Sequence, residues 1–185
     1  MFILDNSPTM HPHWDQVVEV SKTLAWFVKR MDKDGLELCA TVPDENNKYR
    51  YDHIKRSTDF EKIATSLKCN RPSDITHTLG DILDEYGKKL KHEDRKRDWK
   101  PRVPSSFKTI KPMTIYIFTD AVWTPESDPT SEILKIVSIL QQNFQYGSTQ
   151  LGIQFIQWGQ IDSPYTRRLE RLDKLKSYHP DMFGE

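Results

Sequence analysis

Short apolar runs typical of buried strands alternate along this chain with segments whose apolar residues recur every three to four positions. Such runs occur at 36–42, 113–120 and 150–158, and the helical spacing is clearest over 14–31. Consecutive parallel strands need a crossover connection, which a helix usually provides. The alternation therefore predicts an α/β fold in which helices cover both faces of a mainly parallel, open sheet.

The remaining segments extend this alternation. The run "KYRYDHI" (48–54) is more polar than the other strands, which suits the edge of a sheet. Further helices are expected over 58–67, 75–90, 131–142 and 165–177. Residues 91–112 are strongly charged and contain three prolines, so they are predicted to form an exposed loop.

Composition limits the classes of protein to which the chain can belong. Its 185 residues suit one domain over 1–185, and 27 basic and 27 acidic residues give a net charge of zero. This balance gives no argument for nucleic acid or a membrane as a partner. No apolar run reaches the length of about 18 residues expected of a membrane span, and no signal peptide is recognised. Cys39 and Cys69 are expected to be free thiols in a cytoplasmic protein.

Polar side chains follow two of the apolar strands at the point where each strand ends. Asp5, Ser7 and Thr9 come after the first run, "FIL", and Asp120 follows "IYIFT" (115–119). In an open parallel sheet, ligands gather beyond the carboxyl ends of the strands. We therefore expect a site at this edge, although turn formation alone also explains the residues of "DNSPT".

A third segment adds another hydroxyl group. Ser73 lies on the loop that leads into the helix expected at 75–90, and Thr76 and Thr78 in the first turn of that helix are alternative ligands. The combined set offers oxygen atoms only. Oxygen ligands suit a hard cation such as Mg²⁺ rather than Zn²⁺.

The order and spacing of these segments resemble the von Willebrand factor A (vWA) domain with its metal-ion-dependent adhesion site (MIDAS), especially intracellular fungal proteins with such a domain. The matching pieces are "DNSPT" (5–9), "PSDITHTLGDIL" (72–83) and "IYIFTD" (115–120). The resemblance implies a doubly wound, Rossmann-like sheet with one antiparallel edge strand. It also implies that five residues surround Mg²⁺, Mn²⁺ or Ca²⁺, directly or through water: Asp5, Ser7, Thr9, Ser73 and Asp120.

The same resemblance implies a binding module that is not an enzyme. The cation would take up an Asp or Glu side chain of a protein partner. Trp123 and Pro125 follow Asp120, and they either pack against the rim of the site or meet that partner. The chain departs from the family pattern where Pro8 and Ala121 replace glycines.

A phosphatase of the haloacid dehalogenase type is the alternative function. Its first motif is also an apolar strand followed by D-x-D-x-T, and "FILDNSPT" fits that outline with Asp5 as a Mg²⁺-assisted nucleophile. The second Asp, which acts there as general acid and base, is replaced by Ser7. A hydroxyl group cannot exchange a proton near neutral pH as a carboxylic acid does. The residues therefore favour the binding module.

The sheet of the vWA family normally continues past the strand expected at 150–158. Only "YHPDMFGE" follows residue 177, so the resemblance implies a domain without its last strand and helix. The 150–158 strand would then form an apolar edge, which exposes unpaired backbone groups. We expect either the C-terminal tail around Met182 and Phe183 or a second copy in a homodimer to cover this edge.

Overall fold

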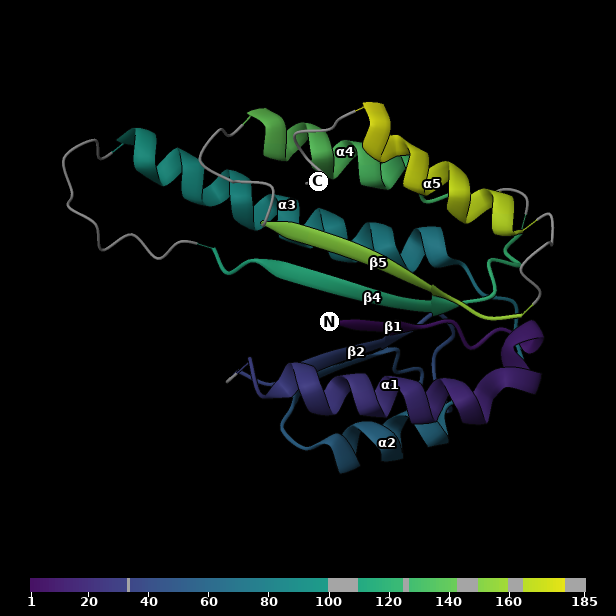
Figure 1. Ribbon diagram of the computed structural model, residues 1–185. Helices are drawn as coiled ribbons and strands as arrows, with labels where there is room; N and C mark the ends of the chain where they lie inside the picture. Colours follow the sequence, from purple (N-terminus) through teal and green to yellow (C-terminus); the bar gives the residue numbers. More distant parts are fainter. Residues whose placement is uncertain (33, 100–109, 125–126, 143–149, 160–164, 179–185) are drawn as a thin grey trace.

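The computed structural model describes residues 1–32, 34–99, 110–124, 127–142, 150–159 and 165–178, and it has an α/β fold (Figure 1). One five-stranded sheet has the strand order β3-β2-β1-β4-β5. The strands are β1 (Phe2–Leu4), β2 (Leu36–Ala40), β3 (Arg50–Ile54), β4 (Met113–Thr119) and β5 (Leu151–Gln157). All neighbours run parallel except β2 and β3, which are antiparallel. The mainly parallel sheet and its polar edge strand are thereby confirmed.

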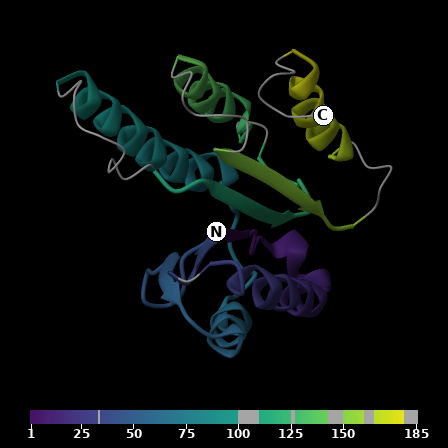
Figure 2. The ribbon, with the colours of Figure 1, turned by 60° about the vertical axis from the view of Figure 1, so that its left-hand side comes forward.

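Helices lie on both sides of this sheet (Figures 1 and 2). One side carries α1 (Trp14–Lys29) and α2 (Ser57–Ser66). The other side carries α3 (Ile75–Trp99), α4 (Thr130–Gln142) and α5 (Thr166–Tyr178). A short 3-10 helix, η1 (Pro8–His13), leads into α1. Within the described ranges, no helix combines the length and the apolar character needed to cross a membrane.

The central strand β1 contributes side chains to two separate cores. Successive side chains of a strand point to opposite faces of the sheet. Ile3 packs with residues of α3 and α4, whereas Phe2 and Leu4 pack with residues of α1 and α2. All three side chains are fully buried, which explains why this strand is a continuous apolar run.

Helix α3 is longer than the sequence predicts. It continues to Trp99, so the loop expected over 91–112 is wrong for residues 91–99. Lys, Arg and Glu dominate this segment, and they favour helices almost as strongly as leucine does. Charge alone was therefore a poor indicator of a loop, and residues 100–109 lie outside the described ranges.

Candidate cation-binding site

The carboxyl ends of β1 and β4 bring Asp5 and Asp120 to the same edge of the sheet. Leu4 of β1 lies opposite Phe118 of β4, and the backbone N–H of Asp5 donates to the Phe118 carbonyl at 2.9 Å. Asp120 directly follows Thr119, the last residue of β4. Asp5 is 0% exposed and Asp120 is 7% exposed. This edge is where the sequence predicts the site.

Hydrogen bonds hold both oxygens of the Asp5 carboxylate. Its Oδ1 accepts the backbone N–H of Ser7 at 3.1 Å and the Thr41 hydroxyl at 3.4 Å. Its Oδ2 accepts the Thr119 hydroxyl at 2.7 Å. A buried carboxylate needs such partners, because the loss of hydration would otherwise be very costly. The bonds also fix the direction in which the remaining lone pairs point.

Thr119 links Asp5 to the segment that follows β4. Its Oγ1 accepts the backbone N–H of Ala121 at 3.0 Å and the indole N–H of Trp123 at 2.9 Å. Trp123 is only 4% exposed and belongs to the core on the α3 side of the sheet. Its side chain therefore packs beneath the site and offers little surface to a partner. Pro125, the other rim residue named from the sequence, lies outside the described residues.

Ser7 and Thr9 are brought together by the short helix η1. Their hydroxyl oxygens lie 3.0 Å apart in a hydrogen bond that either residue can donate. Pro8 occupies the first position of η1, a position that suits the fixed backbone angle of proline. Ser7 is buried and Thr9 is exposed, so this pair extends from Asp5 to the surface.

Ser73 carries a buried hydroxyl group without a partner. The residue is 5% exposed, and its Oγ has no hydrogen bond among the described residues. A buried polar atom without a partner costs about 1–3 kcal/mol, so a ligand that completes it is favoured. The segment before it contacts the Asp5 loop, since the Asn6 amide donates to the Lys68 carbonyl at 3.2 Å. Burial, and next the charge of Asp5, raise the pKa of the neighbouring Cys69 thiol to about 12.

The two alternative hydroxyls near Ser73 are occupied within the protein. The Thr76 hydroxyl forms a hydrogen bond of 3.1 Å with Ser127, and the Thr78 hydroxyl donates to the Asp74 carbonyl at 3.2 Å. The Ser127 hydroxyl in turn donates to the Asp74 carboxylate at 3.0 Å. These bonds stabilise the start of α3 against the segment after β4. Ser73 therefore remains the better candidate ligand.

Asn6 is a structural residue of the site that the sequence did not single out. Its side-chain Oδ1 accepts the Val42 N–H at 2.8 Å, and its Nδ2 donates to the carbonyls of Val42 and Lys68. Thr41 and Thr119 were also missed. Both are polar residues at the end of an otherwise apolar strand run, and this is the signal that could have indicated them.

The donor set consists of two carboxylates and several neutral hydroxyl groups. Within the described ranges, no three His, Cys, Asp or Glu side chains are grouped so that they could hold a metal ion. A site with few carboxylates suits a hard cation that keeps part of its water shell, as Mg²⁺ usually does. The unpartnered Ser73 hydroxyl is compatible with this kind of ion. Comparisons of the chain with protein-family models, curated proteins and solved structures find no match.

Proposed function

We propose that this chain is a vWA-like protein-binding module that depends on a divalent cation and is not an enzyme. The observation that carries the proposal is the buried hydroxyl of Ser73, which has no partner among the described residues and follows a segment whose Lys68 contacts the loop of Asp5. The strand order, with helices on both sides of the sheet, supports the likeness to a doubly wound vWA fold.

Five residues would hold the cation in this proposal: Asp5, Ser7, Thr9, Ser73 and Asp120. Asp120 uses Oδ1 to accept the Val122 N–H at 2.9 Å, and among the described residues no hydrogen bond reaches its Oδ2. Asp5 is held rigidly by Thr119 and Ser7, so its orientation is set in advance. When bound, Mg²⁺, Mn²⁺ or Ca²⁺ would supply a position that a carboxylate oxygen can occupy.

The proposed partner is a protein that presents an Asp or Glu side chain. Two carboxylates balance the charge of a divalent cation, while the hydroxyl ligands add no charge. An outside carboxylate that replaces a water ligand would therefore meet less repulsion here than in a site with three or four acidic ligands. The neutral net charge gives no argument for nucleic acid as the partner, so the proposal is a protein partner, with the cytoplasm as the location.

A phosphatase that uses Asp5 as its nucleophile is less well supported. Asp5 is 0% exposed and both of its oxygens accept hydrogen bonds, which restricts attack on a phosphorus atom. Ser7 stands where the general acid and base would be needed, and its hydroxyl pairs with Thr9.

Calorimetric titration with Mg²⁺ and Mn²⁺ tests the proposal directly. The wild type should bind either cation, and Ser73→Ala should weaken binding at least about tenfold. Without the cation its melting temperature should not fall and should rise slightly, because Ser73→Ala removes a buried hydroxyl that has no hydrogen bond among the described residues. Ser21→Ala is the matched control, since Ser21 is also buried but donates to the Val18 carbonyl away from the site.

Asp120→Asn provides a second variant that separates binding from catalysis. It keeps the acceptor for the Val122 N–H but removes the charge, so cation binding should be lost while the fold remains. No turnover of an aryl phosphate is expected with Mg²⁺. Absence of binding in the wild type would contradict the proposal, and turnover that Asp5→Asn abolishes would favour the phosphatase.

A further inference from the structure

The outer edge of β5 has a regular row of backbone groups without partners among the described residues. Gln150 accepts the Met113 N–H at 3.0 Å, and the Trp158 N–H donates to the Thr119 carbonyl at 2.9 Å. Even-numbered residues of this segment therefore turn their backbone groups toward β4. Backbone direction alternates along a strand, so the odd-numbered residues turn outward: Leu151, Ile153, Phe155 and Gln157. No described residue pairs with their backbone groups. Met182 and Phe183, which the sequence offers as another cover of this edge, lie outside the described residues.

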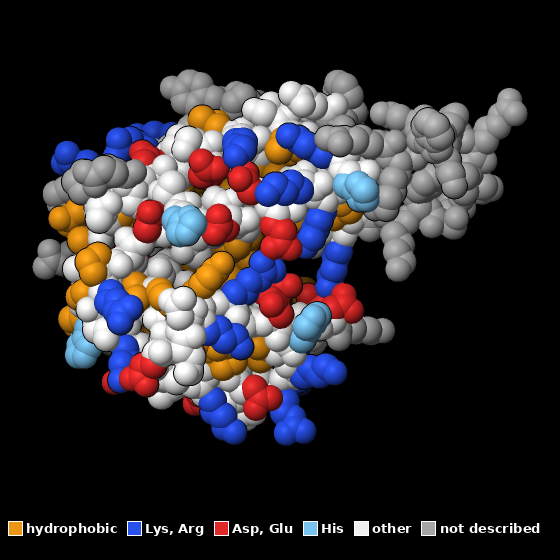
Figure 3. Space-filling model, turned by 180° about the vertical axis from the view of Figure 1, so that it is seen from behind, with side chains coloured by type: hydrophobic (Ala, Val, Ile, Leu, Met, Phe, Trp, Pro, Cys, Tyr) orange, Lys and Arg blue, Asp and Glu red, His pale blue; other side chains and the backbone are white. Residues whose placement is uncertain are grey.

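The opposite edge of the sheet is protected against strand pairing by its own residues, whereas the residues of β5 offer no such protection. Strand β3 carries the polar side chains of Arg50, Asp52 and His53. His53 also has a positive φ of 56°. The pairing register between β2 and β3 shifts at an irregularity between Leu36 and Leu38. Charges and bulges of this kind prevent edge pairing. Figure 3 shows that acidic and basic side chains are interspersed over the face that is turned away from the viewer in Figure 1. In contrast, β5 reads "LGIQFIQ" and contains neither charge nor proline.

We propose that the outer edge of β5 pairs in antiparallel fashion with β5 of a second copy of this chain. With the two-fold axis at Gln154, Ile153 lies opposite the partner's Phe155, and Leu151 lies opposite the partner's Gln157. Every outward N–H and C=O group of both strands then has a partner. A register shifted by two residues leaves some of these groups unpaired, so the pairing at Gln154 is favoured.

The side chain of Gln154 favours a second copy of this chain as the partner of β5. It is the one exposed residue of β5, and the two-fold axis places it directly opposite the same residue of the partner. An amide both donates and accepts hydrogen bonds, so two identical amides satisfy each other. No like charges meet along the strand, and the same surface serves both subunits, as a two-fold interface requires.

This pairing does not depend on the proposed cation site. A two-fold axis perpendicular to the sheet reverses the strand direction between the copies. The carboxyl ends of β1 and β4 would therefore lie at opposite edges of the joined sheet. The dimer would present its two Asp5 loops in opposite directions and could join two separate partners.

Variants that carry a charge at position 154 test the inference. Sedimentation velocity at a series of concentrations measures the fraction of dimer. The wild type should form a dimer whose fraction rises with concentration. Gln154→Lys and Gln154→Glu place like charges on the axis, and each should raise the dimer dissociation constant at least about tenfold. An equimolar mixture of the two variants should restore the dimer, because opposite charges then face each other.

Gln16→Lys is the control, since Gln16 is exposed on α1 and should leave the dimer unchanged. Thermal unfolding of each variant verifies that the monomers are folded. A wild type that stays monomeric throughout the series overturns the inference. So do dimers that persist in both charged variants, or a mixture of variants that stays monomeric.

Discussion

The hydroxyl of Thr119 donates a hydrogen bond of 2.7 Å to Oδ2 of Asp5, although the two residues are 114 positions apart in the chain. The hydroxyl oxygen of Thr119 also accepts the backbone N–H of Ala121 and the indole N–H of Trp123. One buried hydroxyl group thus orients the candidate cation ligand and fixes the path of the chain after β4. Stability and site geometry depend on the same atom.

Thr119→Val should destabilise the protein by about 2–4 kcal/mol, because it leaves three buried polar groups without their partner. Urea unfolding measures this loss. Thr114→Val is the matched control, since Thr114 is exposed on the same strand and should change stability by less than about 0.5 kcal/mol. Equal effects of the two substitutions would show that the Thr119 hydroxyl has no special role.

Asn6→Ala should cost about 2–3 kcal/mol, because the Val42 and Lys68 segments lose their common partner. Asn46→Ala, at an exposed position in a turn, should be nearly neutral. Asn6→Ala should speed hydrogen exchange at the Val42 amide relative to the wild type, while exchange at amides of β4 should change less. Unchanged exchange at Val42 would contradict the role given to Asn6.

Ala121 should tolerate glycine but not a branched side chain. It is fully buried and has a φ of 60°, a conformation that β-branched residues adopt only with strain. Ala121→Gly relieves this strain but loses a buried methyl group, so its stability should stay within about 1 kcal/mol of the wild type. Ala121→Val should lose more than about 2 kcal/mol of stability. Thermal unfolding of both variants beside the wild type measures these changes.

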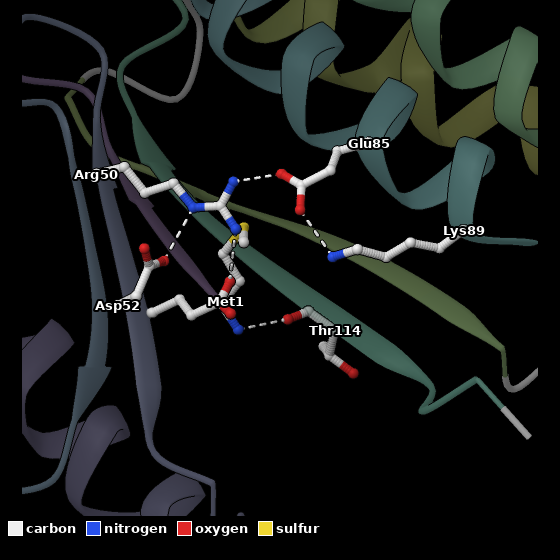
Figure 4. A network of polar contacts seen from close by, with 7 residues as sticks. Met1, Arg50, Asp52, Glu85, Lys89 and Thr114 are labelled. Atoms are coloured by element: carbon white, nitrogen blue, oxygen red, sulfur yellow. Dashed lines mark hydrogen bonds and ion pairs between the residues drawn. The ribbon is translucent and has the colours of Figure 1, made fainter. Parts of the chain in front are cut away.

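Arg50 of β3 forms ion pairs with three carboxylates, and Figure 4 shows it with two of them, Asp52 of β3 and Glu85 of α3. Its guanidinium lies 2.5 Å from Glu85, 2.9 Å from Asp52 and 3.5 Å from Glu37. Arg50→Met should cost about 1 kcal/mol near neutral pH, because solvent screens these half-exposed pairs. Arg56→Met, at an exposed position, should cost less than about 0.5 kcal/mol.

The cost of Arg50→Met should also depend on pH. Hydrogen bonds from Lys89 and Arg50 hold the pKa of Glu85 below its ordinary value of 4.5. Stabilisation from a lowered carboxyl pKa is complete above the unfolded-state value and is lost as pH falls through the folded-state value. The difference between wild type and variant should therefore shrink between about pH 6 and about pH 3. An equal difference in stability between wild type and variant at about pH 6 and at about pH 3 would contradict this account.

The two cysteines should resist thiol reagents while the protein is folded. Burial raises the pKa of Cys39 to about 12, and burial together with Asp5 raises that of Cys69 to about 12. Only the thiolate reacts readily. A colorimetric thiol titration at neutral pH should detect slow reaction in the native protein and two thiols in denaturant. Fast native reaction of Cys69 would show that its environment is more open.

Periodicity and strand ends made much of the fold predictable from the sequence. Parallel strands end at the same edge, so Asp5 and Asp120 could be assigned to one side of the sheet. The partners of Asp5 could not be found in this way. Thr41 and Thr119 reach it only through the register of three strands, and that register depends on packing between distant segments.

Local charge misled the prediction for residues 91–99. They were assigned to a loop because the stretch 91–112 is charged and contains three prolines, yet α3 continues through 91–99. The helical preference of Lys, Arg and Glu does not depend on an apolar stripe, so hydrophobic spacing cannot reveal such an extension.

The position of β1 has a consequence for the time at which the protein can fold during synthesis. This strand of three residues lies at the centre of the sheet, between β2 and a strand that ends at Thr119. Contacts between such distant segments close a long loop and slow folding. On the ribosome, the middle of the sheet stays incomplete until β4 has emerged, so β1 cannot pair on both sides until the segment up to Thr119 has been made.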